Sequence, residues 1–131
     1  MSKKLVYSIS SWLPPVILMA IIFYLSSDQH PPLVSAPLLN FILYKTIHLC
    51  VFGTLYAAFF RAFYRTAHPD ITNIYIFSFM ATILFAASDE YHQTFVLGRD
   101  GNPQDVAIDT LGASFVYFFI KHNLKKIKKF L

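Results

Sequence analysis

Residues 88–113 read SDEYHQTFVLGRDGNPQDVAIDTLGA, and they place ionisable side chains between two long apolar segments. The stretch combines aspartates and a glutamate with a histidine and an arginine. An α-helix needs about 20 mostly apolar residues to cross the hydrocarbon core of a bilayer, and the segments 73–96 and 105–121, which overlap the two ends of this stretch, approach that length. The pattern therefore predicts two membrane-spanning helices joined by a short turn, with charged groups carried into the end of each helix.

The composition of the whole chain agrees with a membrane protein. The chain has 131 residues, which is enough for one domain, and 56% of them are hydrophobic while only 14% are charged. Soluble domains carry about 25% charged residues. The net charge of +4 must therefore be placed relative to a bilayer, and it does not indicate binding to nucleic acid. The single cysteine, Cys50, cannot form an internal disulfide and is expected to be a small buried hydrophobe.

Four segments are long and apolar enough, or nearly so, to span a bilayer: residues 6–25, 38–62, 73–96 and 105–121. We therefore predict an all-α fold for a single domain over residues 1–131. The expected architecture is an integral membrane four-helix bundle with short outer loops.

Two prolines, Pro14 and Pro15, lie inside the first predicted span. They either begin the helix, with Ser10 or Ser11 as its cap, or kink a longer helix. We favour the kink, because the apolar segment that follows the prolines is too short to cross a bilayer alone. A signal peptide is disfavoured, because the small-residue site at 34–36 lies well past the apolar segment.

The distribution of positive charge predicts the orientation, because cytoplasmic loops carry an excess of lysine and arginine. With four spans, all such residues except Lys45 and Arg99 fall on one side: Lys3, Lys4, Arg61, Arg65, Lys121, Lys125, Lys126, Lys128 and Lys129. That side is predicted to be the cytoplasm, so both termini lie inside. The basic C-terminal tail is expected to rest on anionic lipid at the inner surface.

Acidic residues collect on the opposite side: Asp28, Asp89, Glu90, Asp100, Asp105 and Asp109. Only Asp70 is predicted to be cytoplasmic. Acidic residues contribute little to topology, so their clustering needs another explanation. At about 1.5 Å of rise per residue, Lys45 and Asp89 both lie about 10 Å below the outer surface.

Within each helix these polar residues follow helical spacing: Lys45 with His48, Asp89 with His92 and Gln93, and Asp105 with Asp109 and Gly112. A charged side chain at the centre of a bilayer costs about 2.5–3.5 kcal/mol, so we expect the groups to face one another. An ion-pair network that fixes helix packing is the simplest interpretation, and Lys45 with Asp89 or Asp109 would suffice for it. The excess of ionisable groups beyond that pair indicates a functional site.

Two residues at the turn have alternative roles. Asp105 can cap the fourth helix. Arg99 can meet an anionic head group or bridge to Asp105 or Asp109.

The long motif in this region resembles the VanZ-like family, which is named for an accessory protein of teicoplanin resistance. Its residues are Asp89-Glu90-Tyr91-His92-Gln93, Phe95, Gly98-Arg99, Asp105 and Asp109-Thr110-Leu111-Gly112-Ala113. Ser26-Ser27, Lys45 with His48, and Phe52-Gly53 are also similar to the family pattern. The resemblance implies a small four-span protein of the bacterial cytoplasmic membrane with a role near the envelope surface, and it implies no particular reaction.

The first functional hypothesis is an enzyme or a binding protein for an envelope lipid or lipid-linked intermediate at the outer leaflet. Candidate substrate contacts are Lys45 and Arg99, which can hold a phosphate, with Gln93, Ser27 and Asp105. Candidate catalytic groups, as bases or proton shuttles, are Glu90, Asp109, Asp89, His92 and His48. A divalent cation, if one is bound, is expected on Asp89, Glu90 and Asp109, where carboxylates and phosphate suit Mg²⁺ better than zinc.

Two other classes stay open. A non-enzymatic accessory protein would dock a partner through the face of Gly112, Ala113 and Ser114. A proton-linked transporter is disfavoured, because the inner half of every span is strongly apolar. Serine-based catalysis through Ser27 or Ser88 beside a histidine is disfavoured too, because sequence distance does not establish the contact.

Overall fold

The computed structural model describes residues 3–28, 32–67 and 70–131, and within them it is all-helical. The elements are α1 (Lys3–Ser26), α2 (Pro37–Thr66), α3 (Ile71–Gln93), α4 (Pro103–Ile127) and a short 3-10 helix, η1 (Lys128–Phe130). The predicted four-helix bundle is confirmed. The main difference lies in α4, which continues to Ile127 through the lysines expected to form a tail, because lysine is a good helix former.

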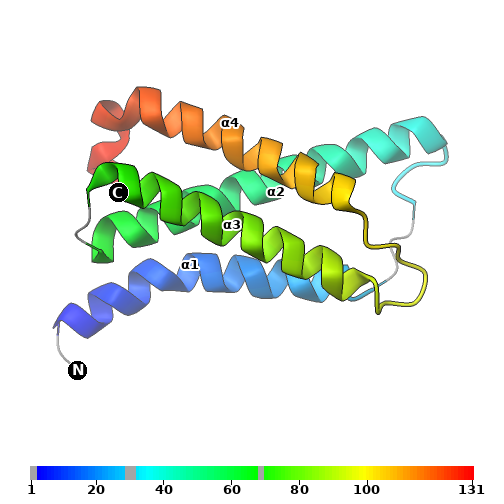
Figure 1. Ribbon diagram of the computed structural model, residues 1–131, viewed down its shortest axis with the longest axis horizontal. Helices are drawn as coiled ribbons and strands as arrows, with labels where there is room; N and C mark the ends of the chain where they lie inside the picture. The colour runs from blue at the N-terminus through cyan, green and yellow to red at the C-terminus, as the bar shows by residue number, and fades with distance from the viewer. Residues whose placement is uncertain (1–2, 29–31, 68–69) are drawn as a thin grey trace.

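The four helices lie side by side along the long axis of the molecule (Figure 1). Both termini lie at one end of the bundle, and the α1–α2 and α3–α4 loops lie together at the other, hereafter the loop end. This arrangement agrees with the predicted placement of both termini on one side of the membrane. It also brings the residues of the long motif to the loop end.

Helix α1 runs without interruption through Pro14 and Pro15, and its ribbon bends in its first half (Figure 1). Ser10 and Ser11 do not cap it. Their hydroxyls donate to the Tyr7 carbonyl, at 2.9 and 2.8 Å, and such bonds from a side chain to the preceding turn bend helices. The kinked-helix prediction therefore describes α1, and the alternative of a helix that begins at the prolines is wrong.

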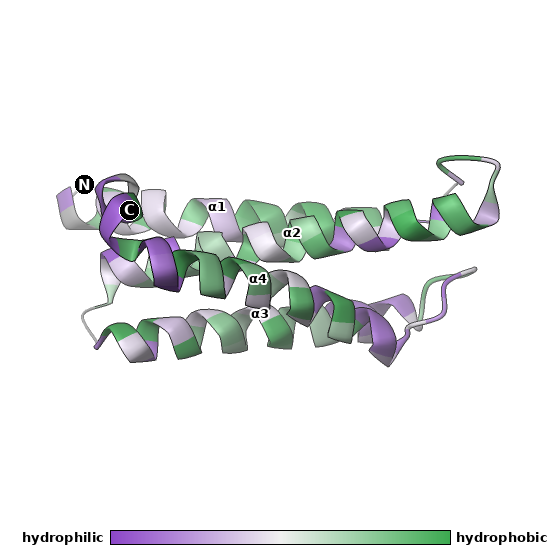
Figure 2. Ribbon diagram, turned by 90° about the horizontal axis from the view of Figure 1, so that it is seen from above, coloured by the Kyte–Doolittle hydropathy of each residue, from purple (hydrophilic) through white to green (hydrophobic). Residues whose placement is uncertain are grey.

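The outer surface of the bundle is apolar. Long side chains such as Leu84, Phe115 and Phe119 are 66%, 64% and 61% exposed, and hydrophilic residues gather towards the ends of α3 and α4 (Figure 2). Three helices, α1 from Leu5 onward, α2 and α3, are long and apolar enough to cross a membrane. The fourth, α4, runs beside them but carries aspartates near its start and lysines near its end. The protein is therefore a membrane protein.

One expectation about this surface was wrong. Cys50 was expected to be buried, whereas it is exposed on α2. The composition of an apolar segment in a membrane protein does not show which residues are buried between helices and which face lipid, because lipid is as apolar as a helix interface.

The packing of α2 against α4 depends on glycines. A Cβ atom on Gly112 would lie 2.1 Å from the Leu49 carbonyl oxygen, and one on Gly53 would lie 3.0 Å from the Gly112 oxygen. The two backbones can approach so closely only because these residues lack a side chain. This contact holds the start of α4 against the part of α2 that carries Lys45 and His48.

Candidate functional site

Charged and amide side chains from three helices and one loop meet at the loop end. We call them the polar cluster, which consists of Lys45, His48, Asp89, Glu90, Gln93, Arg99, Asp105 and Asp109. Its acidic members on α3 are buried, with Asp89 2% and Glu90 5% exposed, and Asp109 on α4 is 1% exposed. The structure thus brings together eight of the residues that the sequence singled out, and it leaves two others, Ser27 and His92, in a separate contact.

On the α3 side, Gln93 joins the two buried carboxylates. Its amide nitrogen donates to Asp89 Oδ2 at 3.0 Å and to Glu90 Oε1 at 3.2 Å. Asp89 also accepts from the Ser26 hydroxyl at 2.6 Å, and the Asn102 backbone N–H donates to Glu90 Oε2 at 2.9 Å. Each carboxylate is therefore held by donors from two parts of the chain.

Arg99 ties the α3–α4 loop to the end of α1. Its guanidinium donates to Gln93 Oε1 at 3.1 Å, to the Asp28 carbonyl at 3.1 Å and to the Leu25 carbonyl at 3.3 Å. Burial lowers the pKa of this guanidinium, while nearby carboxylates raise it. Arginine nevertheless stays charged, so Arg99 places a permanent positive charge beside the acidic groups of α3.

Between α2 and α4, Lys45 forms an ion pair with Asp105, and His48 Nδ1 lies 3.2 Å from Asp109 Oδ1. The expected partners of Lys45, Asp89 or Asp109, were wrong. The expectation that Asp105 caps α4 was wrong as well, because Asn102 is the N-cap and its side chain accepts from the Gln104 N–H at 3.0 Å. Asp105 lies in the first helical turn, where its carboxylate is free to meet Lys45.

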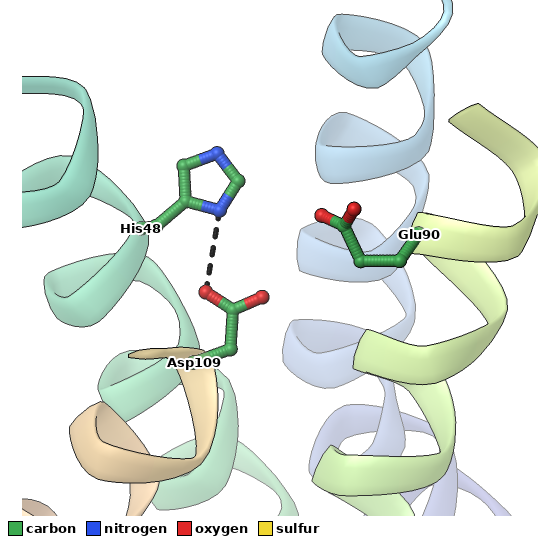
Figure 3. A group of neighbouring side chains, drawn as sticks. All are labelled: His48, Glu90 and Asp109. Atoms are coloured by element: carbon green, nitrogen blue, oxygen red, sulfur yellow. Dashed lines mark hydrogen bonds and ion pairs between the residues drawn. The ribbon is translucent and has the colours of Figure 1, made fainter. Parts of the chain in front are cut away.

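His48, Glu90 and Asp109 approach from three different helices (Figure 3). Each offers one ligand atom, and these atoms all lie within 4.8 Å of one another. Asp109 Oδ2 is buried and has no hydrogen-bond partner. The sequence had suggested Asp89, together with Glu90 and Asp109, as ligands for a divalent cation. In the structure His48 lies with Glu90 and Asp109, whereas Asp89 bonds to Ser26 and Gln93.

Ser27 and His92 form a separate contact between α1 and α3. The Ser27 hydroxyl lies 3.0 Å from His92 Nε2 and 2.6 Å from the Phe23 carbonyl, and the His92 ring stacks on Phe23 with ring centroids 4.2 Å apart. A carbonyl only accepts hydrogen bonds, so the single serine proton goes to Phe23 and the imidazole donates to the serine oxygen. In this arrangement His92 does not activate Ser27 as a nucleophile.

Two cavities lie beside the polar cluster and share two lining residues. The polar cavity, of about 330 Å³, is lined by Lys45, Arg99 and Asp105 with Pro37, Asn40, Phe41, Tyr44 and His48. The apolar cavity, of about 340 Å³, lies between α1 and α2 and is lined by Ile22, Leu25, Leu33, Ile47, Val51 and Phe52, again with Tyr44 and His48. Tyr44 and His48 therefore line both.

The sequence interpretation had missed Tyr44 and Asn40. Tyr44 stands four residues before His48, so helical spacing could have placed it on the same face. Asn40 orders the loop before α2, because its side chain accepts from the Leu33 N–H at 2.7 Å, and no spacing in the sequence signals that contact.

Comparison with known proteins places these residues in a family. The family model described as VanZ/LLP1 matches residues 6–126, which is nearly the whole chain. No curated protein and no solved structure matches.

Proposed function

This chain belongs to the VanZ/LLP1 family, and from that premise we propose that it binds an envelope lipid whose head group carries a phosphate. The binding site is the pair of cavities at the loop end. The head group occupies the polar cavity, and the apolar chain occupies the neighbouring cavity between α1 and α2.

The observation that carries this proposal is that Tyr44 and His48 line both cavities. A small polar molecule would need only the polar cavity, and a hydrocarbon would need only the apolar one. A ligand that fills both must be amphipathic, with its polar and apolar parts joined where the Tyr44 and His48 side chains lie. Lipids have this construction.

The charges in the polar cavity favour phosphate as the head group. Lys45 and Arg99 line the cavity from α2 and from the α3–α4 loop. Lysine binds phosphate as a point charge, and arginine offers a planar fork of donors. Lys45 is paired with Asp105, so an incoming phosphate competes with a carboxylate for the same ammonium group.

The distribution of lysine and arginine supports an outer-leaflet site in the cytoplasmic membrane. The end of the bundle opposite the loop end carries most of the lysines and arginines, and such residues mark the cytoplasmic side. The loop end then faces outward, as proposed for a protein that acts near the envelope surface. The link between this family and teicoplanin resistance, which the sequence resemblance supplies, agrees with that position and is an analogy.

Acid–base chemistry on the bound lipid is part of the same proposal. The Asp109 carboxylate orients the His48 imidazole, as carboxylates do for histidines that transfer protons. Replacing Glu90 with Gln or Asp109 with Asn should then abolish function in cells while the amount of protein in the membrane stays the same. Full function in both variants would exclude an acid–base role.

Binding can be measured by native mass spectrometry on the purified protein in detergent. The probes are a polyprenyl phosphate, the uncharged polyprenol of the same length, and inorganic phosphate. Hydrogen bonds to charged groups contribute about 1.5–3 kcal/mol, so the polyprenyl phosphate should bind at least about tenfold more tightly than the polyprenol. Equal binding of the two lipids would contradict the proposal, and binding of inorganic phosphate alone would reduce the site to an anion site.

Matched variants separate the head-group contacts from general charge effects. Lys45→Gln and Arg99→Gln should each weaken the binding of polyprenyl phosphate about tenfold. Lys121→Gln removes a lysine from the opposite end of the bundle and should leave the affinity unchanged. The double variant Lys45→Gln with Asp105→Asn controls for the unpaired aspartate that the single lysine change leaves behind.

Neither alternative class gains a supporting observation among the described residues. The face proposed for docking a partner is occupied, because Gly112 and Ala113 are buried inside the bundle. Ser78 and Thr82 of α3 donate to carbonyls of their own helix, so they give no support to a proton pathway.

A further inference from the structure

We propose that His48, Glu90 and Asp109 bind one divalent first-row transition-metal ion, such as Zn²⁺ or Mn²⁺. The three side chains come from α2, α3 and α4 and turn towards a common space (Figure 3). Their ligand atoms all lie within 4.8 Å of one another. In a tetrahedral site with ligand atoms about 2.1 Å from the ion, those atoms lie about 3.4 Å from one another, so side-chain movements of about 1 Å complete the site.

An unsatisfied oxygen points into this space. Asp109 is 1% exposed, and its Oδ2 atom makes no hydrogen bond, while Oδ1 lies beside His48 Nδ1. Figure 3 shows the second oxygen on the side of Asp109 that faces Glu90. A buried carboxylate oxygen without a hydrogen-bond partner raises the free energy of the folded protein, and a cation bound to that oxygen would remove this penalty.

The surroundings of Glu90 suit a metal ligand. Gln93 and the Asn102 N–H each donate to one of its oxygens, which fixes the direction of the carboxylate and leaves further lone pairs available. Hydrogen bonds of this kind orient metal ligands in many proteins. Glu90 is therefore held in place by the chain before any ion arrives.

The charge of the polar cluster also calls for a cation. When ionised, its four carboxylates carry four negative charges, while its lysine and arginine carry two positive ones. Two negative charges remain in a region where charge is expensive. A protonated His48 would neutralise one of them, whereas a divalent ion neutralises both.

The imidazole decides the class of metal. Mg²⁺ takes oxygen ligands almost exclusively and keeps several waters, whereas imidazole suits zinc and the other late first-row metals, and carboxylates extend the range to manganese. The expectation of Mg²⁺ rested on a set of three carboxylates. With His48 in place of Asp89, the donor set favours a transition metal.

Metal binding does not depend on a bound lipid, so it can fail or succeed separately from lipid binding, but an ion on His48, Glu90 and Asp109 would take the place of their acid–base role. His48 also lines the polar cavity, so an ion on these residues would lie at the edge of the site proposed for the phosphate.

The test uses the purified full-length protein in detergent, stripped with a chelator and dialysed against micromolar Zn²⁺, Mn²⁺ or Mg²⁺. Elemental analysis should give about one Zn²⁺ or Mn²⁺ per chain and no retained Mg²⁺. The metal should also raise the thermal unfolding temperature of the unmodified protein, which requires no variant. Absence of stoichiometric metal, or equal retention of Mg²⁺, would overturn the proposal.

Variants locate the ion. His48→Gln, Glu90→Gln and Asp109→Asn should each weaken binding about tenfold or more, because even residues that only orient a ligand cost that much. Asp109→Asn keeps an oxygen that can accept from His48, so it is the variant expected to disturb the fold least. His122→Gln removes an exposed histidine of α4 that bonds to Phe118, and it should bind metal as the unmodified protein does. Unchanged binding in all three site variants would place the metal elsewhere and overturn the assignment.

Discussion

At the scale of single residues, the polar cluster shows how a chain in a membrane satisfies buried charge. Asp89 receives hydrogen bonds from Ser26 and Gln93, and Lys45 pairs with Asp105. Each bond joins two different helices, except the one between Asp89 and Gln93 within α3. The charged residues therefore fix the helix arrangement while they also form the site, so the ion-pair interpretation and the functional one describe the same contacts.

Two neighbouring serines allow the contribution of these hydrogen bonds to the helix arrangement to be tested. The Ser26 hydroxyl is buried and donates to Asp89 at 2.6 Å, whereas the Ser27 hydroxyl is exposed, donates to Phe23 of its own helix and lies beside His92. Ser26→Ala should destabilise the fold by about 1–3 kcal/mol, because it removes a donor from a buried carboxylate. Ser27→Ala removes an exposed hydrogen bond with His92 and should cost less, about 1 kcal/mol at most. Thermal unfolding in detergent measures both, and equal stability of the two variants would contradict the role given to Ser26.

At the scale of elements, the contact of α2 with α4 sets the geometry of the site. Gly53 and Gly112 let the backbones touch, and this contact places His48 beside Asp109. Gly53 and Gly112 are thus structural requirements of the site, although neither belongs to the polar cluster.

Gly112→Ala should therefore separate the two helices. The added Cβ would lie 2.1 Å from the Leu49 carbonyl oxygen, which belongs to backbone and cannot rotate away. We expect a loss of about 1–3 kcal/mol and weaker metal binding at His48 and Asp109. Ala107→Val enlarges an exposed residue of the same helix and should leave both properties unchanged. If Gly112→Ala were as stable as Ala107→Val, the close contact would be wrong.

The helices themselves could be predicted from the sequence, because the length of an apolar segment is set by the thickness of the bilayer. The ionisable members of the site were predicted too, since a charge in such a segment must turn inward. Which charged side chains pair with each other was not predicted. Lys45 could reach any aspartate at similar depth, and the choice of Asp105 depends on how closely α4 approaches α2. Capping was one of two roles considered for Asp105, and Asn102, three residues earlier, has the same capping ability and takes that position.

At the scale of the whole molecule, the protein has a polar end and an apolar body. Its loop end holds the polar cluster and both cavities, and its other end holds the two termini (Figure 1). The proposed outer-leaflet lipid site requires that the loop end face outward.

The orientation can be tested by labelling single cysteines in intact cells. In a Cys50→Ser background, Asp100→Cys places a thiol in the α3–α4 loop and Lys129→Cys places one near the C-terminus, both at exposed positions. A membrane-impermeant maleimide should label residue 100 in intact cells and residue 129 only after permeabilisation. The reverse pattern would put the site on the cytoplasmic side.

The central claim is that Tyr44 lies where the polar and apolar parts of one bound lipid meet. A photo-reactive phenylalanine derivative at position 44 would capture that lipid in living cells, and mass spectrometry of the adducts would identify it. The same group at Leu84, which is 66% exposed on α3, reports the surrounding bilayer. We expect adducts at position 44 to be enriched in a phosphate-bearing lipid that is rare at position 84. Identical lipid compositions at the two positions would contradict that claim.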